Sequence, residues 1–159
     1  MRKVIDKMLG HLLVFLMTFL VVDVLWQVMS RYLMSSPSSF TDELAGMLLI
    51  WVGLLGAAYV FGRNEHLAID LLLQKLSPKR QLVLQTVIWM IVLLFALTVF
   101  VIGGSWLVYT RFYLEVTSAS LQLNMGYVYL VLPVSGLLTV YYAIDNSRRL
   151  WKGEKLINE

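Results

Sequence analysis

The stretch DELAGMLLIWVGLLGAAYVFGRNEH, residues 42–66, contains an apolar run from Leu44 to Gly62 between an acidic start and a polar end. A helix that spans a membrane needs about 20 predominantly apolar residues. This run is apolar on every face, whereas apolar and polar residues alternate along a barrel strand. Because a helix satisfies its own backbone hydrogen bonds, which lipid cannot do, the run predicts a transmembrane helix.

Three further apolar runs flank this one, at about 8–29, 82–112 and 125–144. Of the 159 residues, 59% are hydrophobic and only 14% are charged, and the mean hydropathy is +0.75. A soluble domain of this size could not hide so much apolar surface from water. We therefore predict an all-α membrane protein, a single membrane domain over residues 1–159 with spans at about 8–29, 44–62, 82–112 and 125–144.

The basic residues predict the orientation of these spans. All of them except Arg31 and Arg111 lie before the first run, between the second and third, or after the fourth. Cytoplasmic flanks of membrane helices are enriched in Lys and Arg, so both termini are expected in the cytoplasm of a bacterial cell, with the chain in the inner membrane. The same placement explains a pI of about 9.2 without nucleic acid as a partner. No small-x-small cleavage site follows the first run, which is expected to be a retained helix.

The segment RNEHLAIDLLLQKLS, residues 63–77, is too short and too charged to span. At helical spacing one face is polar, and the other consists of Ile69, Leu72, Leu73 and Leu76. This pattern predicts an amphipathic helix over about 64–77 that lies in the cytoplasmic interface and anchors the chain there. An ordinary solvated loop is the alternative.

Asp23 is the only acid inside the predicted spans, and Gln27 follows on the same helix face. An ionisable residue in lipid is costly and often functional, so one interpretation is the proton site of an autonomous small exporter. The other is a hydrogen bond within the protein or with a partner. Haem ligation by His11 and His66 is a further possibility, but neither lies where a buried axial ligand is expected. With no nucleophile–base pair, metal cluster or phosphate loop in the sequence, we predict neither an enzyme nor a cofactor.

One stripe of the second span predicts a packing surface, formed by Glu43, Gly46, Ile50, Gly53 and Ala57. Gly53-x-x-x-Ala57 is a small-x-x-x-small motif, which lets helices approach closely in lipid. Trp51 lies within the helix rather than at a membrane interface, where tryptophan is usually found. Four helices have little interior, so the stripe is expected to meet a partner, with packing inside this chain as the alternative.

The residues from Ser30 to Asp70 resemble the small membrane subunit, the DctQ-like or Q subunit, of tripartite ATP-independent periplasmic (TRAP) transporters. The resemblance covers essentially the whole chain, but its distinctive positions are few. They are Arg31, Tyr32, Asp42, Glu43, Trp51, Gly56, Ala57, Ala58, Arg63, His66 and Asp70, with Pro133 and Gly136 in the fourth span. Phe40 departs from the tryptophan common in the family but keeps an aromatic ring.

This resemblance implies a function that composition does not show. In the family, a soluble periplasmic protein captures an organic acid, and a large membrane subunit moves it inward with sodium. The small subunit is expected to scaffold the large one and to help dock the binding protein, with sialic acid or another sugar acid slightly favoured over C4-dicarboxylates. The expected partner interface comprises Asp42, Glu43, Gly46, Ile50, Trp51, Gly53, Gly56, Ala57, Arg63 and His66.

Overall fold

The computed structural model describes residues 2–33, 39–63 and 78–151. The elements are α1 (Arg2–Leu33), α2 (Ser39–Gly62), α4 (Pro78–Phe95), a π-helical segment η1 (Ala96–Gly103), α5 (Gly104–Tyr113), α6 (Met125–Tyr129) and α7 (Val131–Trp151). Four continuous helical stretches, Arg2–Leu33, Ser39–Gly62, Arg80–Tyr113 and Met125–Arg149, are long and apolar enough to cross a membrane. The all-α, four-span prediction is therefore confirmed. The predicted interfacial helix, including His66, Ile69, Leu72, Leu73 and Leu76, lies outside the described residues.

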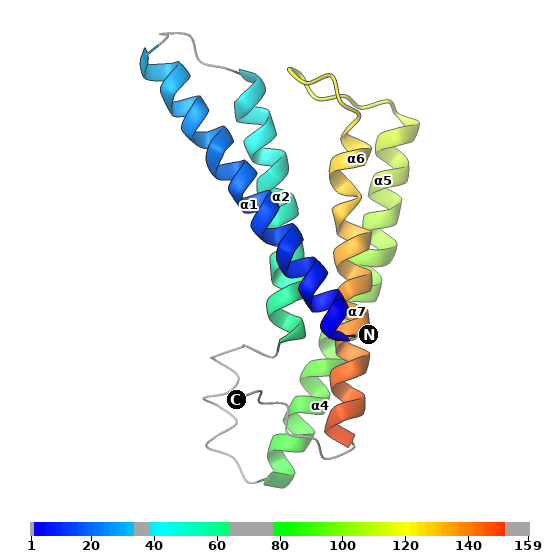
Figure 1. Cartoon of the computed structure of the whole chain (residues 1–159). Coiled ribbons are helices and arrows are strands. Elements are labelled where there is room, and N and C mark those ends of the chain that lie inside the picture. Colours follow the sequence, from blue (N-terminus) through cyan, green and yellow to red (C-terminus); the bar gives the residue numbers. More distant parts are fainter. Residues whose placement is uncertain (1, 34–38, 64–77, 152–159) are drawn as a thin grey trace.

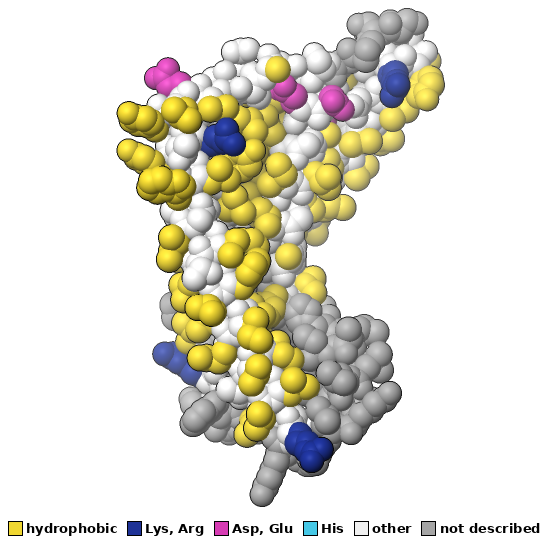
Figure 2. All heavy atoms as spheres, turned by 180° about the vertical axis from the view of Figure 1, so that it is seen from behind, with side chains coloured by type: hydrophobic (Ala, Val, Ile, Leu, Met, Phe, Trp, Pro, Cys, Tyr) yellow, Lys and Arg dark blue, Asp and Glu magenta, His cyan; other side chains and the backbone are white. Residues whose placement is uncertain are grey.

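Two helical hairpins make up the molecule (Figure 1). One consists of α1 and α2, and the other of α4–η1–α5 followed by α6–α7. The hairpins meet at the end that carries the start of α1, where α7 contacts α2, α4 and η1, and they diverge toward the opposite end (Figure 1). We call these the inner end and the outer end. On the face in Figure 2, apolar side chains cover the middle and charged ones lie toward the two ends, as expected for a membrane protein.

Helix α1 packs along α2 through a single narrow stripe. The residues of this stripe that are not exposed recur at alternating spacings of four and three, as in a coiled coil: Leu9, Leu13, Leu16, Leu20, Asp23, Gln27 and Ser30. The first four are leucines and the last three are polar, so the seam changes character toward the outer end. Most of the remaining α1 surface is apolar and exposed, which suits contact with lipid.

The buried core lies where α2, α4 and α7 meet. Phe61 and Trp89 pack edge to face, with ring centroids 4.8 Å apart, beside the fully buried Tyr142. Farther along, α7 lies close against the third span at two glycines. A Cβ at Gly104 would be 2.9 Å from Leu132 Cβ, and one at Gly136 would be 2.7 Å from Phe100 Cβ. The third span and α7 therefore approach closely at Gly104 and Gly136, because a side chain at either position would collide with the opposite helix.

Two irregularities interrupt the long helices. The third span is π-helical over Ala96–Gly103, opposite α7, and π segments occur where a helix adjusts locally to its surroundings. The fourth span has a turn residue at Leu130, between α6 and α7. Pro133 follows three residues later and has no N–H to donate to the preceding turn, so one helical hydrogen bond is missing there, although the helix continues through Leu130.

Candidate partner-binding surfaces

One face of α2 is open along the middle of the helix. Gly46, Ile50, Gly53 and Ala57 are all exposed, and no atom outside the local helix would lie within 4 Å of a Cβ added at Gly46 or Gly53. We call these four residues the α2 face. No part of residues 2–33, 39–63 or 78–151 packs against it, so the described chain makes no use of the small-x-x-x-small motif. The face is available to lipid or to another subunit.

Glu43 was expected on the same stripe, but its carboxylate is engaged by the chain itself. Oε1 and Oε2 each accept a hydrogen bond from the Ser120 amide at 3.0 Å, and Oε2 also accepts one from the Leu121 amide at 3.1 Å. Glu43 thus joins the start of α2 to the segment between α5 and α6. This contact links the two hairpins at the outer end, where they otherwise diverge.

The segment 114–124, which we call the outer loop, has a defined backbone. The Ser118 amide donates to the Leu123 carbonyl at 2.9 Å, and the Met125 amide donates to the Val116 carbonyl at 2.8 Å. The Asn124 side chain accepts from the Gly126 amide at 2.8 Å and caps α6. Because Glu43 also accepts hydrogen bonds from it, the outer loop presents a surface of fixed conformation. Sequence reasoning missed it, although Asn124 directly before an apolar run is a helix-start signal.

Asp42 and Asp23 lie along the outer half of the α1–α2 seam. Gln27 Nε2 donates to Asp42 Oδ1 at 2.7 Å and so joins the two helices. Asp23 is only 7% exposed, and its Oδ2 atom has no hydrogen-bond partner among the described residues. Asp23 is therefore buried between the two helices, whereas the Gln27–Asp42 hydrogen bond lies at the exposed edge of the seam.

Three other residues expected at the partner interface make contacts within the chain. Trp51 Nε1 donates to the Val128 carbonyl at 3.0 Å and ties α2 to α6. Gly56 faces α1, because a Cβ there would be 4.0 Å from Leu13 Cδ2. The Arg63 guanidinium donates to the Tyr59 hydroxyl at 3.0 Å and lies over the same ring. These contacts position α2 and leave the α2 face free.

A polar cluster at the inner end was not predicted. Arg2 Nη1 donates to Asp145 Oδ2 and to Asn146 Oδ1, each at 2.7 Å, and Nη2 donates to the Gly62 carbonyl. Asn146 is fully buried, and its amide also donates to the Gly62 carbonyl at 3.3 Å. The cluster joins the first turn of α1, the end of α2 and the last turns of α7. From the sequence, Arg2 is expected only as one of the basic residues that mark the cytoplasmic side of the membrane.

The described residues offer little for catalysis or metal binding. Within residues 2–33, 39–63 and 78–151, no group of three His, Cys, Asp or Glu residues lies together so as to hold a metal ion. His11, one candidate haem ligand, is exposed on α1. The arrangement instead provides an open helix face, a held outer loop and rigid links between two hairpins.

The sequence is similar to subunits of one class of bacterial transporter. The family described as "Tripartite ATP-independent periplasmic transporters, DctQ component" matches residues 20–153. A Haemophilus influenzae protein named as a TRAP transporter small permease is 32% identical over 103 residues, 65% of this chain and 63% of that protein. The sialic acid TRAP transporter small permease SiaQ of Vibrio cholerae is 28% identical over 152 residues, 96% and 86% of the two chains. The sialic acid TRAP transporter permease SiaT of H. influenzae is 36% identical over 53 residues, 33% of this chain and 9% of that protein.

Proposed function

We propose a role from the premise that this chain belongs to the family of DctQ components of TRAP transporters. It is a multi-pass membrane protein and a permease subunit of a transporter, which is not an enzyme class. Its role is that of a non-catalytic scaffold. It holds the large membrane subunit in the bilayer and helps to dock the periplasmic binding protein.

The open α2 face is the observation that carries the scaffold role. Lipid tails are as apolar as these side chains, so helices associate in membranes through close packing at small residues. Gly46, Gly53 and Ala57 provide such a surface with nothing of the described chain upon it. The partial match to SiaT supports a large partner, because a segment similar to this chain occurs within a much longer permease.

The outer loop is the part that we assign to the binding protein. Its backbone is held by Glu43, Glu115 within it is exposed, and the exposed Asp42 directly precedes Glu43 in the chain. Complementary charge steers partners together and fixes their orientation more than it adds affinity. A held outer surface that carries exposed charges, Asp42 and Glu115 with Arg31 at the end of α1, therefore suits a partner that docks and leaves in every transport cycle.

The proposed role also includes a direction of transport and a class of transported substrate. Transport is sodium-driven uptake of an organic acid across the bacterial inner membrane, and both termini are cytoplasmic. The names of two relatives favour sialic acid or another sugar acid over a C4-dicarboxylate. Reporter fusions test the orientation: fusions at the C-terminus and within 63–80 are expected to report cytoplasm, and those at Ser36 and Ser118 periplasm.

An autonomous proton-coupled exporter that uses Asp23 remains the alternative in which the chain transports by itself. Such a carboxyl group must exchange protons with water and meet its cargo. Asp23 is 7% exposed, and its Oδ2 is enclosed in the α1–α2 seam. That position favours a packing role over an exchange site.

Reconstitution tests the proposal directly. Proteoliposomes with this chain alone should take up no substrate, and sodium-driven uptake should require the large subunit and the binding protein as well. Gly53→Leu should separate the two membrane subunits in mild detergent, whereas Thr18→Leu, on the exposed side of α1, should not. Uptake by the chain alone that is abolished by Asp23→Asn would establish the exporter instead.

A further inference from the structure

Two basic side chains near the start of α1 have no counter-charge in the part of the chain that the structure describes. Arg2 is paired with Asp145 at 2.7 Å, but among the described residues no carboxylate lies within salt-bridge distance of Lys3 or Lys7. Both lysines are exposed. They are four residues apart, as are Lys7 and His11, so the three side chains follow one ridge of the helix.

His11 has a defined arrangement on this ridge. Its Nδ1 atom is 2.6 Å from the Lys7 carbonyl oxygen. A carbonyl only accepts hydrogen bonds, so Nδ1 carries a hydrogen, and in the neutral ring Nε2 is then an acceptor that does not bond a phosphate oxygen. Lys3, Val4, Lys7, Met8 and His11 line a shallow hollow of about 560 Å³. The hollow combines cationic groups with an apolar floor.

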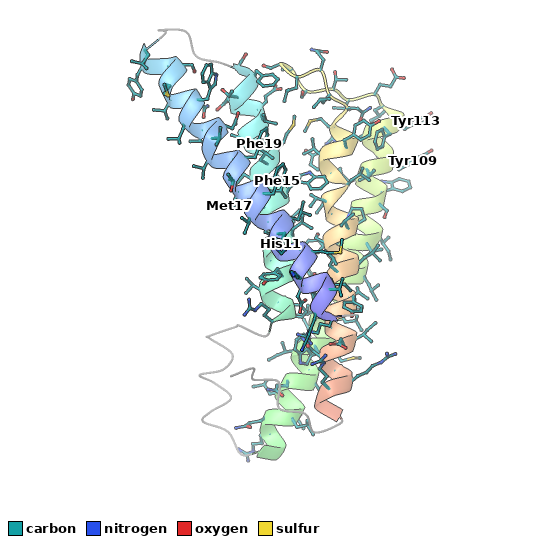
Figure 3. All side chains as sticks on the ribbon, in the orientation of Figure 1. His11, Phe15, Met17, Phe19, Tyr109 and Tyr113 are labelled. Atoms are coloured by element: carbon teal, nitrogen blue, oxygen red, sulfur yellow. The ribbon has the colours of Figure 1, made fainter. Side chains whose placement is uncertain are left out.

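The ridge continues into two aromatic rings. Phe15 and Phe19 are both exposed, and their rings stack with centroids 6.4 Å apart and an interplanar angle of 7°. Figure 3 shows His11, Phe15 and Phe19 following one another along α1 away from its start. Phe15 lies eight residues beyond Lys7, about 12 Å along the helix axis. The ridge is thus cationic at one end and aromatic deeper in the membrane.

We propose that this ridge binds one anionic phospholipid in the leaflet at the inner end. The headgroup phosphate lies at Lys3 and Lys7, and an acyl chain passes His11 and lies along Phe15 and Phe19. An anionic headgroup would neutralise the two lysines, and an acyl chain would cover the exposed rings of Phe15 and Phe19. A nucleotide or a free phosphate would leave these rings uncovered. The ridge comprises residues 3–19, whereas the family match begins at residue 20. The proposed lipid site therefore does not depend on the proposed transporter role.

Native mass spectrometry of the full-length chain in detergent tests the site with dioleoyl phosphatidylglycerol, dioleoyl phosphatidylcholine and inorganic phosphate as probes. Phosphatidylglycerol should be retained in preference to phosphatidylcholine. Lys3→Gln with Lys7→Gln should weaken its retention by on the order of tenfold, since each lysine near an anionic headgroup contributes to binding. Lys3→Arg with Lys7→Arg should preserve retention, and Phe15→Ala with Phe19→Ala should reduce it.

The matched control removes two exposed basic residues elsewhere, Arg80→Gln with Arg148→Gln. It should leave phosphatidylglycerol bound. Equal loss in this control would show that diffuse positive charge is responsible and would overturn the site. Equal retention of phosphatidylcholine, or displacement of the lipid by millimolar inorganic phosphate, would also overturn it, the latter in favour of a simple phosphate site.

Discussion

Replacing Arg2 with Met should open the inner end of the molecule. The guanidinium donates to Asp145, to Asn146 and to the Gly62 carbonyl, and so joins three helix ends. Met has a similar reach but no donors. The substitution leaves Asn146 Oδ1 without this donor in a position where the residue is fully buried.

The magnitude follows from the bonds that are lost. A hydrogen bond to a charged group contributes about 1.5–3 kcal/mol, and the Arg2 guanidinium donates to Asp145, Asn146 and the Gly62 carbonyl. These effects overlap in one cluster, so we expect a loss of about 3 kcal/mol in the free energy of unfolding. For a chain of this size, that loss corresponds to a fall in Tm of about 6–12 °C.

Thermal unfolding in a zwitterionic detergent, followed by circular dichroism and size-exclusion chromatography, measures the effect. Lys3→Met is the matched control, because it removes a neighbouring positive charge that has no described carboxylate partner. Arg2→Lys should fall between the two, since an ammonium group lacks the planar fork of donors. An unchanged Tm in Arg2→Met, or an equal fall in Lys3→Met, would refute the clamp.

Three further predictions concern α2. Gly62→Ala should destabilise the chain by about 1–3 kcal/mol, because its Cβ would lie 2.7 Å from a buried tyrosine ring, whereas Gly53→Ala, with open space at its Cβ, should not lower the Tm. Glu43→Gln should speed hydrogen exchange of the Ser120 and Leu121 amides, which now donate hydrogen bonds to the Glu43 carboxylate. Asp42→Asn should leave the exchange of these amides unchanged. Equal exchange rates in the two variants would contradict the contact. Trp51→Phe should cost about 1 kcal/mol by removing one indole hydrogen bond to α6, and no change in Tm would mean that this bond contributes nothing.

The spans were predictable because each depends on local composition. An apolar run of about 20 residues has few alternatives to a membrane helix, whatever surrounds it. The stripe on α2 was also predictable in part, since Gly46, Gly53 and Ala57 share a face by helical periodicity alone. That it is open within the described chain required the positions of the other helices.

Contacts between distant parts of the chain were not predictable. Glu43 shares the stripe of Gly46 by spacing, yet its longer side chain reaches the Ser120 amide, 77 positions away. Arg2 and Asp145 are 143 positions apart, and a single sequence does not show that these helix ends meet. The π-helical segment η1 likewise has no local signal, because it lies opposite α7, whose packing depends on the whole fold.

Site-directed cross-linking tests most directly the central claim that the α2 face holds the large subunit. The chain contains no cysteine, so single cysteines at Leu49, Ile50 and Val60, exposed residues on or directly beside the α2 face whose side chains are already large, can each carry a photoreactive group in membranes that also contain the large subunit. We predict adducts with the large subunit from all three positions and none from Gly56→Cys, which faces α1. Adducts with lipid alone at the three positions, while the two subunits still purify together, would contradict the account.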